Sequence, residues 1–330
     1  MMNQKILSIV VPVYNMQDSL AHCLDSLLVS SQELMQMLEV IVVNDGSSDG
    51  TSALAHGYET RFPGVFYVID KENGNSGSCI NAALAVATGK YFRQLDADDW
   101  LDTEALEQFI PLLMEHEEDC VSTPHNECYP NSCIRAGDAS SVAYGQAYSI
   151  DDIRMTRDEK GMLFMHSLTF RLDLLRRYGH HQQEGIYYTD IEQCYFALAN
   201  AHDIYFCDLC LYQYRLGWVG QSVVFPQYVK NRTHMLKVSA RLLDDFLVRS
   251  ASLTENRQCT LADQLLGVLN MTYMSYLFYA ADDPDFLALD QLVVSSPEIC
   301  RRIESYWLRG IPYIKMWHDF GLTPTFLHLV

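Results

Sequence analysis

The sequence of 330 residues has no continuous run of about 18 apolar residues, the length that a helix needs to cross a bilayer. Basic residues are also scarce: 23 Lys and Arg stand against 42 Asp and Glu, and the net charge is -19. This balance disfavours attraction to nucleic acid or to an anionic membrane surface. The first residues lack the small-residue cleavage site of a signal peptide. We therefore expect a folded cytoplasmic protein that does not bind nucleic acid.

Two common phosphate-binding motifs are missing as well. The sequence contains neither the Walker A pattern nor G-x-G-x-x-G. Their absence disfavours P-loop NTPases and NAD-type Rossmann proteins.

The ten cysteines lack the spacing of a secreted disulfide scaffold. We expect them to be reduced and mostly buried, as in a cytosolic chain of this size. One C-x-x-C pair, Cys207 and Cys210, lies in an apolar segment and has no second pair at zinc-finger spacing. Buried thiols are the expected role of this pair, and a redox or zinc role is the alternative.

The first part of the chain alternates strand-like and helix-like segments. Continuous apolar runs predict buried strands, and apolar residues at helical spacing predict the helices between them. This alternation implies an α/β fold with a parallel sheet and right-handed crossovers. The expected strands are 6–13, 40–43, 65–69, 91–95 and 120–124, and the expected helices are 19–29, 52–61, 77–88 and 103–117.

The rest of the chain is less regular and then becomes helical. We expect residues 125–162 to loop over a site. Strands are expected at 167–171 and 204–215, with helices from Asp173 and at 190–201. Further helices are expected at 261–281, 284–294 and 297–308. The sequence therefore predicts an α/β domain over residues 1–225 and a helical region over 226–330 that packs on it.

Carboxylates follow the strand expected at 91–95. Side chains alternate along a strand, so Asp96 and Asp98 project on one side at its carboxyl end, where open α/β sheets bind ligands. A pair of carboxylates suits a divalent cation that also holds phosphates. The alternative is an acidic turn before the next helix, with Asp102 or Thr103 as the N-cap.

The other early strands also end in groups suited to a nucleotide. Tyr14 can stack on a base after Pro12 fixes the strand exit, and Asp45 can accept a hydrogen bond from a base N–H. Glycines in segment 71–78 let backbone N–H groups approach phosphates at a helix N-terminus. The plainer interpretations are an ordinary strand end, an Asx-turn and a flexible turn.

Taken together, four segments in the first hundred residues resemble the family 2 glycosyltransferases, which have the GT-A fold, a nucleotide-binding α/β sheet. The resemblance implies a nucleotide-sugar donor, usually a UDP-sugar, together with Mg²⁺ or Mn²⁺. The segments are residues 8–15, 39–51, 87–91 and 96–100, the last containing the DXD motif Asp96-Ala97-Asp98.

The resemblance also implies roles for individual residues. Tyr14 and Asp45 would lie at the base, Asp96 near the ribose and metal, and Asp98 on the metal that bridges the diphosphate. One departure is Ile80, which stands where many members have an arginine, so Lys71 is the candidate for that cationic contact. The expected donor-binding set is Pro12, Val13, Tyr14, Asn15, Asp45, Lys71, Asn73, Gly77, Ser78, Asn81, Asp96, Ala97 and Asp98.

The second half resembles a bacterial subgroup of the same family. Residues 165–171 look like its acceptor-side segment, and residues 184–192 resemble the Glu-Asp motif, in which the Asp is the general base. That Asp is Asp190 here, although its position also suits a helix N-cap. A lone histidine such as His166 is more often structural than catalytic. The acceptor-side or loop candidates are Trp100, His166, Glu192, Arg215, Gln221 and Ser222.

These inferences predict an inverting hexosyl- or N-acetylhexosaminyl-transferase of cell-surface polysaccharide or glycolipid synthesis. It would move the sugar to a saccharide or lipid-linked acceptor by a single displacement with Asp190 as base. One alternative is a sugar nucleotidyltransferase, which would need a Gly-rich basic loop after the first strand. The other is an inactive nucleotide-sugar-binding protein, which the presence of Asp96, Asp98 and Asp190 disfavours.

The segment 306–317 is rich in aromatic residues with cations between them. This composition suits a peripheral contact with the inner face of the cell membrane or with a lipid-linked acceptor. The alternatives are packing into the core or a homodimer contact, since aromatic residues commonly drive packing.

Overall fold

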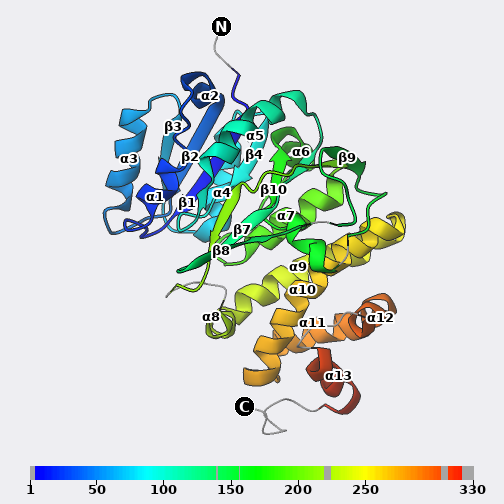
Figure 1. Ribbon diagram of the computed structural model, residues 1–330. Helices are drawn as coiled ribbons and strands as arrows, with labels where there is room; N and C mark the ends of the chain where they lie inside the picture. Colours follow the sequence, from blue (N-terminus) through cyan, green and yellow to red (C-terminus); the bar gives the residue numbers. More distant parts are fainter. Residues whose placement is uncertain (1–3, 139, 156, 219–223, 306–310, 322–330) are drawn as a thin grey trace. The chain divides into compact units, whose positions relative to one another are not determined.

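The computed structural model describes residues 4–138, 140–155, 157–218, 224–305 and 311–321. The chain divides into two compact units, Met1–Val219 and Gly220–Val330 (Figure 1). Each unit is described by itself below, and the expected packing of the helical region on the first domain stays a prediction.

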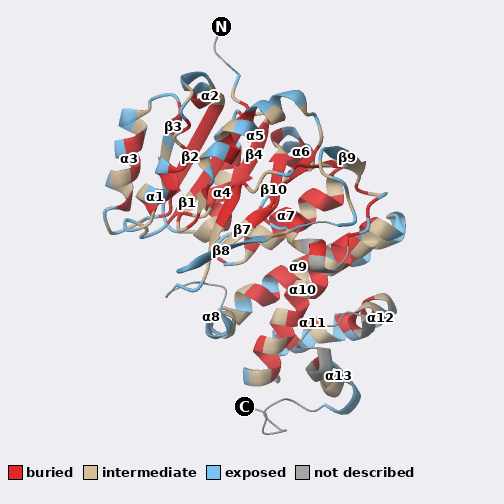
Figure 2. Ribbon diagram, in the orientation of Figure 1, coloured by how far each residue is buried: buried red, intermediate tan, exposed pale blue. Residues whose placement is uncertain are grey.

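A mixed sheet with strand order β3-β2-β1-β4-β10-β6-β11-β9 forms the core of the first unit, as far as its residues are described. Its first four strands are parallel, as the apolar runs predict; β1, β2 and β4 are almost entirely buried, whereas β3 is buried only at Phe66 (Figure 2). Strand β10 runs antiparallel between β4 and β6. The strands are β1 (Leu7–Val13), β2 (Leu38–Asn44), β3 (Phe66–Asp70), β4 (Tyr91–Gln94), β6 (Cys120–Ser122), β9 (Gln146–Ser149), β10 (Leu168–Arg171) and β11 (Asp203–Phe206).

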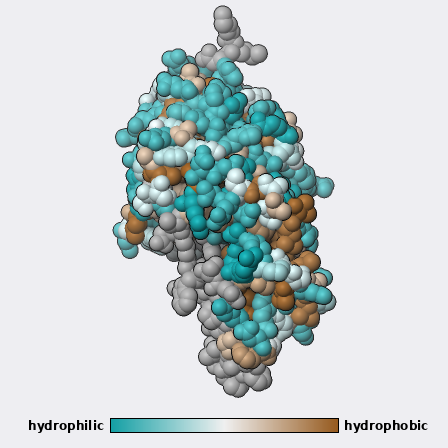
Figure 3. All heavy atoms as spheres, turned by 90° about the vertical axis from the view of Figure 1, so that its right-hand side faces the viewer, coloured by the Kyte–Doolittle hydropathy of each residue, from teal (hydrophilic) through white to brown (hydrophobic). Residues whose placement is uncertain are grey.

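Helices flank this sheet, and their positions follow the predicted alternation. The helix α2, which was not predicted, precedes β2 and is capped by the Ser31 side chain. On the face drawn in Figure 3 the first unit is mostly hydrophilic, in keeping with its charged surface. The helices are α1 (Leu20–Asp25), α2 (Gln32–Met37), α3 (Thr51–Arg61), α4 (Asn75–Val86), α5 (Thr103–Glu115), α6 (Leu172–Arg177) and α7 (Thr189–Asn200).

A second, smaller sheet corrects two predictions. Residues 125–162 are not one loop, because they contain β7, β8, β9 and a 3-10 helix, η1 (Arg157–Leu163). Residues 204–215 are not one strand, because β11 pairs in the first sheet and β12 in the second. The chain changes sheets within an apolar run, where periodicity gives no break. The second sheet has the order β5 (Trp100–Leu101), β12 (Tyr212–Arg215), β7 (His125–Tyr129), β8 (Ser132–Ala136).

The hairpin of β7 and β8 also corrects the expectation that every cysteine is reduced. Cys128 and Cys133 are directly opposite in its register, with their Cα atoms 4.1 Å apart, and form a disulfide. The other eight cysteines are free thiols. Cys207 is buried, and Cys210 is half-buried and donates to Asn126 Oδ1 at 3.0 Å.

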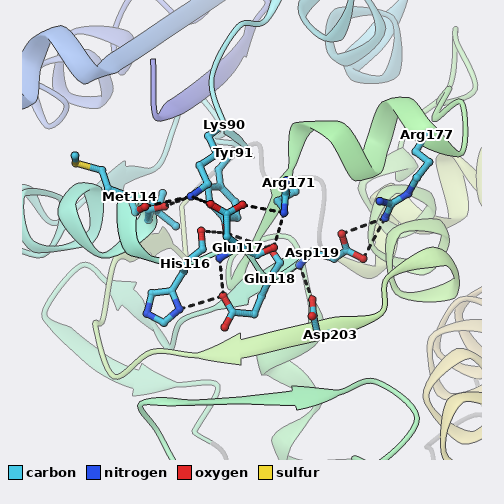
Figure 4. Close-up of polar contacts among 11 residues, drawn as sticks. Lys90, Tyr91, Met114, His116, Glu117, Glu118, Asp119, Arg171, Arg177 and Asp203 are labelled. Carbon is cyan, nitrogen blue, oxygen red and sulfur yellow. Dashed lines mark hydrogen bonds and ion pairs between the residues drawn. The ribbon is translucent and has the colours of Figure 1, made fainter. Parts of the chain in front are cut away.

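Charges at the amino end of β4 are paired (Figure 4). The Lys90 ammonium lies 2.8 Å from one carboxylate oxygen of Glu117, and the Arg171 guanidinium lies 3.1 Å from the other. The Tyr91 hydroxyl lies within hydrogen-bonding distance of the backbone oxygens of His116 and Glu118, at 3.0 and 3.1 Å. These contacts tie the start of β4 to the end of α5.

The second unit is helical, as predicted. Its two long helices, α9 and α10, pack on each other, and Thr254 caps the start of α10. No helix in the described residues is long and apolar enough to span a bilayer. The helices are α8 (Phe225–Lys230), α9 (Arg232–Arg249), α10 (Glu255–Tyr279), α11 (Pro284–Val294), α12 (Pro297–Ser305) and α13 (Ile311–Phe320).

Helix α13 contains the described part of the aromatic segment 306–317. Trp317 and His318 lie on the carboxylate of Asp290 in α11, with Trp317 Nε1 at 3.1 Å and His318 Nε2 at 2.8 Å. Tyr273 of α10 donates to the same carboxylate. The described part of this segment therefore packs within the helical unit, while residues 306–310 lie outside the described residues.

Candidate active site

The candidate site lies at the carboxyl ends of neighbouring parallel strands. Val13 of β1 is paired with Asn44 of β2, and β3 and β4 flank this pair. The residues that follow these strands therefore meet at one edge of the sheet, where open α/β sheets bind ligands. The predicted residues directly after these strand ends are Tyr14, Asn15, Asp45, Lys71 and Asp96.

The turn after β1 presents Tyr14 to solvent, with 49% of its surface exposed. Asn15 has a φ of +53°, in the left-handed region that asparagine tolerates. Its side-chain oxygen accepts from Ser48 N at 2.8 Å, and its own N–H donates to Ser47 Oγ at 3.0 Å. The turn is thus fixed to the loop after β2, and the exposed ring is available to stack on a base. By contrast, Val13 is buried in the sheet.

Asp45 is buried at the end of β2 and lies in an ion pair. Its Oδ1 accepts from Lys71 Nζ at 2.8 Å and from the Gly74 N–H at 2.9 Å. Lys71 also donates to Ser78 Oγ at 2.8 Å and to a backbone oxygen. The ammonium of Lys71 therefore neutralises Asp45, and any phosphate contact by Lys71 must compete with these acceptors. Asn73 joins the cluster through the Asp45 backbone oxygen, at 3.0 Å.

Two glycines at the start of α4 have different consequences. One lets a neighbouring segment pack closely against the helix, and the other leaves the helix N-terminus without a capping side chain. A Cβ on Gly77 would lie 2.2 Å from the backbone oxygen of Gln183, so only glycine fits there. The N-cap of α4 is Gly74, which has no capping side chain. The first N–H groups of this helix remain suited to an anion.

The turn after β4 contains three aspartates, of which one is held by hydrogen bonds within the protein and two are half-buried. Asp99 is buried and accepts from Tyr212 at 2.6 Å and from Arg215 N at 2.7 Å. The Tyr212 hydroxyl also accepts from the Asp96 N–H at 3.2 Å, which fixes the turn. The N-cap of α5 is Asp102. Asp96 and Asp98 are half-buried and are not needed for capping; Ala97 between them is buried.

Electrostatics show that Asp96, Asp98 and Asp190 lie close together. Burial, then the charges of Asp98 and Asp190, raises the pKa of Asp96 to about 7, although a hydrogen bond from Gln94 acts in the opposite direction. Burial also raises the pKa of Asp98, while the Arg215 guanidinium lowers it. Three chain segments, around residues 96–98, 190 and 215, thus bring three carboxylates and one guanidinium close enough to interact.

A divalent cation fits the pair Asp96 and Asp98. Both carboxylates are half-buried, and their mutual repulsion would be relieved by a positive ion. The described residues contain no group of three or more His, Cys, Asp or Glu that could hold a metal. Two protein carboxylates, completed by phosphate and water, match the preference of Mg²⁺.

Asp190 lies in the first turn of α7 and is half-buried. The N-cap of this helix is Tyr188, so the N-cap interpretation of Asp190 is wrong. Tyr188 has a φ of +71°, a strained conformation for a bulky residue. Burial raises the pKa of Asp190, while its own N–H and that of Ile191 lower it. A residue with positive φ two positions before a half-buried carboxylate agrees with the hypothesis that this turn is functional.

Two of the expected site residues form internal contacts. Glu192 is fully buried and accepts from Gln183 N at 3.1 Å, which leaves it poorly placed to take a proton from an acceptor. The Asn81 side chain contacts the loop 182–185. A donor contact by Asn81 stays a prediction.

The remaining candidates are His166, Trp100, Gln221 and Ser222. The His166 ring lies 3.9 Å from that of Tyr214, and burial, then His125 and Arg93, lowers its pKa to about 3. His166 is therefore neutral near pH 7 and forms part of an aromatic cluster. Trp100 packs on His22 with ring centroids 4.8 Å apart. Gln221 and Ser222 lie outside the described residues.

Sequence reasoning missed Arg93 as a support of this site. It is fully buried in β4, donates to Thr169 Oγ1 at 2.7 Å and also contacts the His166 backbone oxygen. It also lies over the Tyr212 ring, 5.6 Å from its centroid. A charged residue in the middle of a buried strand is the signal that could have revealed it, since such residues are almost never buried unpaired.

Comparison with known proteins decides the family. The profile described as "Glycosyl transferase family 2" matches residues 8–168, which include the turns after β1, β2 and β4. The chain carries a family 2 glycosyltransferase domain. Chondroitin synthase of Pasteurella multocida is 33% identical over 132 residues, or 40% of this chain and 13% of that protein. The poly(ribitol-phosphate) beta-glucosyltransferase of Bacillus spizizenii is 33% identical over 114 residues, or 34% of this chain and 18% of that protein. The matches thus span less than a fifth of either relative.

A solved structure confirms the fold of the chain. S. aureus TarS (1–349), in complex with UDP-GlcNAc, superposes with a TM-score of 0.67. The match covers 95% of this chain and 87% of the other, at 17% identity. At that identity the likeness concerns the fold alone, and it confirms the predicted GT-A type.

Proposed function

We propose that this glycosyltransferase moves a sugar from a uridine diphosphate sugar to an acceptor hydroxyl, with inversion and with a divalent cation. One observation carries the proposal: Asp96, Asp98 and Asp190 converge at the sheet edge that also presents Tyr14 and Asp45. This edge combines a base pocket, a cation site and a general base.

The donor would lie along this edge. Tyr14 stacks on the uracil, and Asp45 accepts its N3–H. The N-terminus of α4 faces the diphosphate. Asp96 and Asp98 would hold Mg²⁺ or Mn²⁺, and the cation would supply positive charge for the diphosphate leaving group.

The transfer is a single displacement at the anomeric carbon. The acceptor oxygen forms a bond to that carbon as the bond to the diphosphate oxygen breaks. Asp190 takes the acceptor proton, and burial favours its role by raising its pKa. The guanidinium of Arg215, near Asp98, adds positive charge beside the leaving group.

The similar proteins support a saccharide or polymer acceptor in the synthesis of cell-surface polysaccharide or glycolipid. Two are named for chondroitin and for poly(ribitol-phosphate), and TarS is bound to UDP-GlcNAc. A hexosyl or an N-acetylhexosaminyl group is compatible with them. Peripheral contact with a membrane or a lipid-linked acceptor through residues 306–317 remains a separate expectation, which liposome flotation tests.

The test is a donor screen followed by product analysis. UDP-glucose and UDP-GlcNAc are incubated with Mn²⁺ and a panel of p-nitrophenyl glycosides, and UDP release and the anomeric configuration of the product are measured. Parallel calorimetry compares UDP with CDP and ADP, which lack the N3–H that Asp45 would accept. We expect preference for UDP and an inverted glycoside. Equal affinity for the three nucleotides would remove Asp45 from the base pocket, and a retained configuration would contradict the single displacement.

A further inference from the structure

The loop 182–185, between α6 and α7, is bound by the Asn81 side chain of α4 on one side and by the Glu192 side chain of α7 on the other. We infer that Asn81 and Glu192 are positioning residues that hold this loop and so fix Asp190 relative to α4. The inference rests on the proposed base role of Asp190 and adds the residues through which that role is kept in place.

On the side of α4, Asn81 binds both backbone groups of one residue. Its Nδ2 donates to the Gln182 oxygen at 3.0 Å, and its Oδ1 accepts from the Gln182 N–H at 2.9 Å. The same Nδ2 donates to Glu184 Oε1 at 2.9 Å. A carboxamide is needed for this two-way contact, because aspartate lacks the donor and alanine lacks both groups.

Glycines bring the loop into contact with the first turn of α4. The Gly185 N–H donates to the Gly74 oxygen at 2.7 Å. The Gln183 backbone oxygen lies 2.2 Å from the position that a Cβ of Gly77 would take. The loop therefore follows the end of α4 that would face the donor diphosphate.

On the side of α7, Glu192 binds the next residue of the loop. Its carboxylate is fully buried and accepts from the Gln183 N–H at 3.1 Å and from the Gln183 side-chain amide. Gln182 Nε2 donates to Gln193 Oε1 at 2.9 Å. Asp190 lies in the first turn of α7, between Tyr188, which has a positive φ, and Glu192, so the loop and the helix together set its position.

The chemical reason is the geometry of proton transfer. A general base must lie within about 3 Å of the hydroxyl that it deprotonates. A displacement of about 1 Å can cost on the order of 10²-fold in rate. Asp190 lies on a turn that the loop supports, whereas the donor would be held by α4. The position of the base relative to the donor therefore depends on contacts between the loop and α4. The Asn81 side chain provides such a contact.

The test is a double-mutant cycle between Asn81→Ala and Asp190→Asn, in the assay with UDP-sugar donors and glycoside acceptors. Asn81→Ala should lower kcat about 10- to 100-fold and leave UDP affinity unchanged. In the Asp190→Asn background the same change should cost less than about 3-fold, because Asn81 acts through Asp190. Glu192→Gln, which keeps the shape of the side chain, should give a smaller loss of the same kind.

Two controls keep the outcome clear. Asn200→Ala removes an asparagine whose amide donates to Phe196 O within α7, at 2.7 Å, and should leave kcat unchanged. Hydrogen exchange measures the protection of the loop amides and needs no substrate. Asn81→Ala should speed exchange of the amides in 182–190 about 10-fold or more. Unchanged exchange there would overturn the inference even if no acceptor in the panel is used.

The results that would contradict the inference differ from those that would contradict the proposed function. A loss that is equal in both backgrounds, or a fall in UDP affinity, would make Asn81 a general structural or donor residue and overturn the inference alone. Near-normal turnover of Asp190→Asn would overturn the base assignment and the inference with it.

Discussion

The two ends of strand β4 carry charge in opposite ways. At the amino end, Lys90 and Arg171 both pair with the Glu117 carboxylate (Figure 4). At the carboxyl end, Asp96 and Asp98 lie half-buried beside each other, and burial with their mutual repulsion raises the pKa of Asp96 to about 7. The charges at the amino end are paired within the protein, whereas at the carboxyl end we propose that a bound cation compensates the two carboxylates.

The contrast separates stability from function. Exposed ion pairs such as those of Glu117 contribute little to stability, while crowded buried carboxylates cost stability unless a ligand compensates. Perturbed pKa values of this kind cluster at functional sites. Substitutions at the amino end should therefore act weakly on stability, and those at the carboxyl end strongly on binding and turnover.

The largest effect is expected at the cation site. Asp98→Ala should abolish the Mn²⁺-dependent part of UDP binding, because one of two metal-binding carboxylates is lost. The melting temperature should not fall, since a repulsive charge is removed from a sheet-end turn. Calorimetry with UDP and a thermal melt measure the two quantities. Unchanged metal-dependent affinity would contradict the assignment.

The next largest effect concerns the base. Asp190→Asn should cut turnover by roughly 10²-fold or more, the usual scale for losing a general base, while UDP affinity is kept. Steady-state kinetics and calorimetry check the two halves. A similar loss in UDP affinity would instead place Asp190 in the donor site.

The core behind the carboxyl end should respond to pH. Burial, then Arg93, lowers the pKa of His125 to about 4, so the folded protein keeps this histidine neutral. Between about pH 6.5 and 4 the unfolded chain binds a proton that the folded chain does not, so this histidine's contribution to stability falls as pH falls.

Comparison with a variant isolates that contribution, because the raised pKa of Asp96 acts in the opposite direction. Relative to His125→Gln, the wild type should lose up to about 1.4 kcal/mol per pH unit in this range. Urea titrations at several pH values measure the difference. Parallel stability curves for the two proteins would show that His125 is charged in the fold.

The smallest effect is expected at the amino end of β4. The Glu117 side chain is 70% exposed, so its ion pairs with Lys90 and Arg171 are weak. Glu117→Gln should change the free energy of unfolding by less than about 1 kcal/mol and leave turnover unchanged. A loss of several kcal/mol would show that this cluster supports the sheet more than its exposure indicates.

The sequence predicted the four parallel strands β1 to β4 and the carboxylates because both follow from local patterns. The apolar run at 6–13 can be buried only as an interior strand, and Asp96 and Asp98 follow another such strand by simple alternation. The Asn44–Asp45 turn was predictable for the same reason, since the carboxyl ends of parallel strands meet at one edge.

Other features depend on contacts between distant residues. The contact between Asn81 and Gln182 joins positions 101 residues apart, and no local pattern in either segment predicts it. The inward orientation of Asp99 depends on Tyr212, 113 residues away. The Cys128–Cys133 disulfide depends on a hairpin register within a stretch that has mixed polar and aromatic composition. Local periodicity holds none of this information.

The most direct test of the central claim is calorimetry of the wild-type chain with UDP, first with Mn²⁺ and then with EDTA. If Asp96 and Asp98 form a cation site for a nucleoside diphosphate, UDP should bind with Mn²⁺ and lose at least about tenfold in affinity without it, a change of about 1.4 kcal/mol. Equal affinity in both conditions, or no binding in either, would contradict the interpretation of this sheet edge as a metal-assisted donor site.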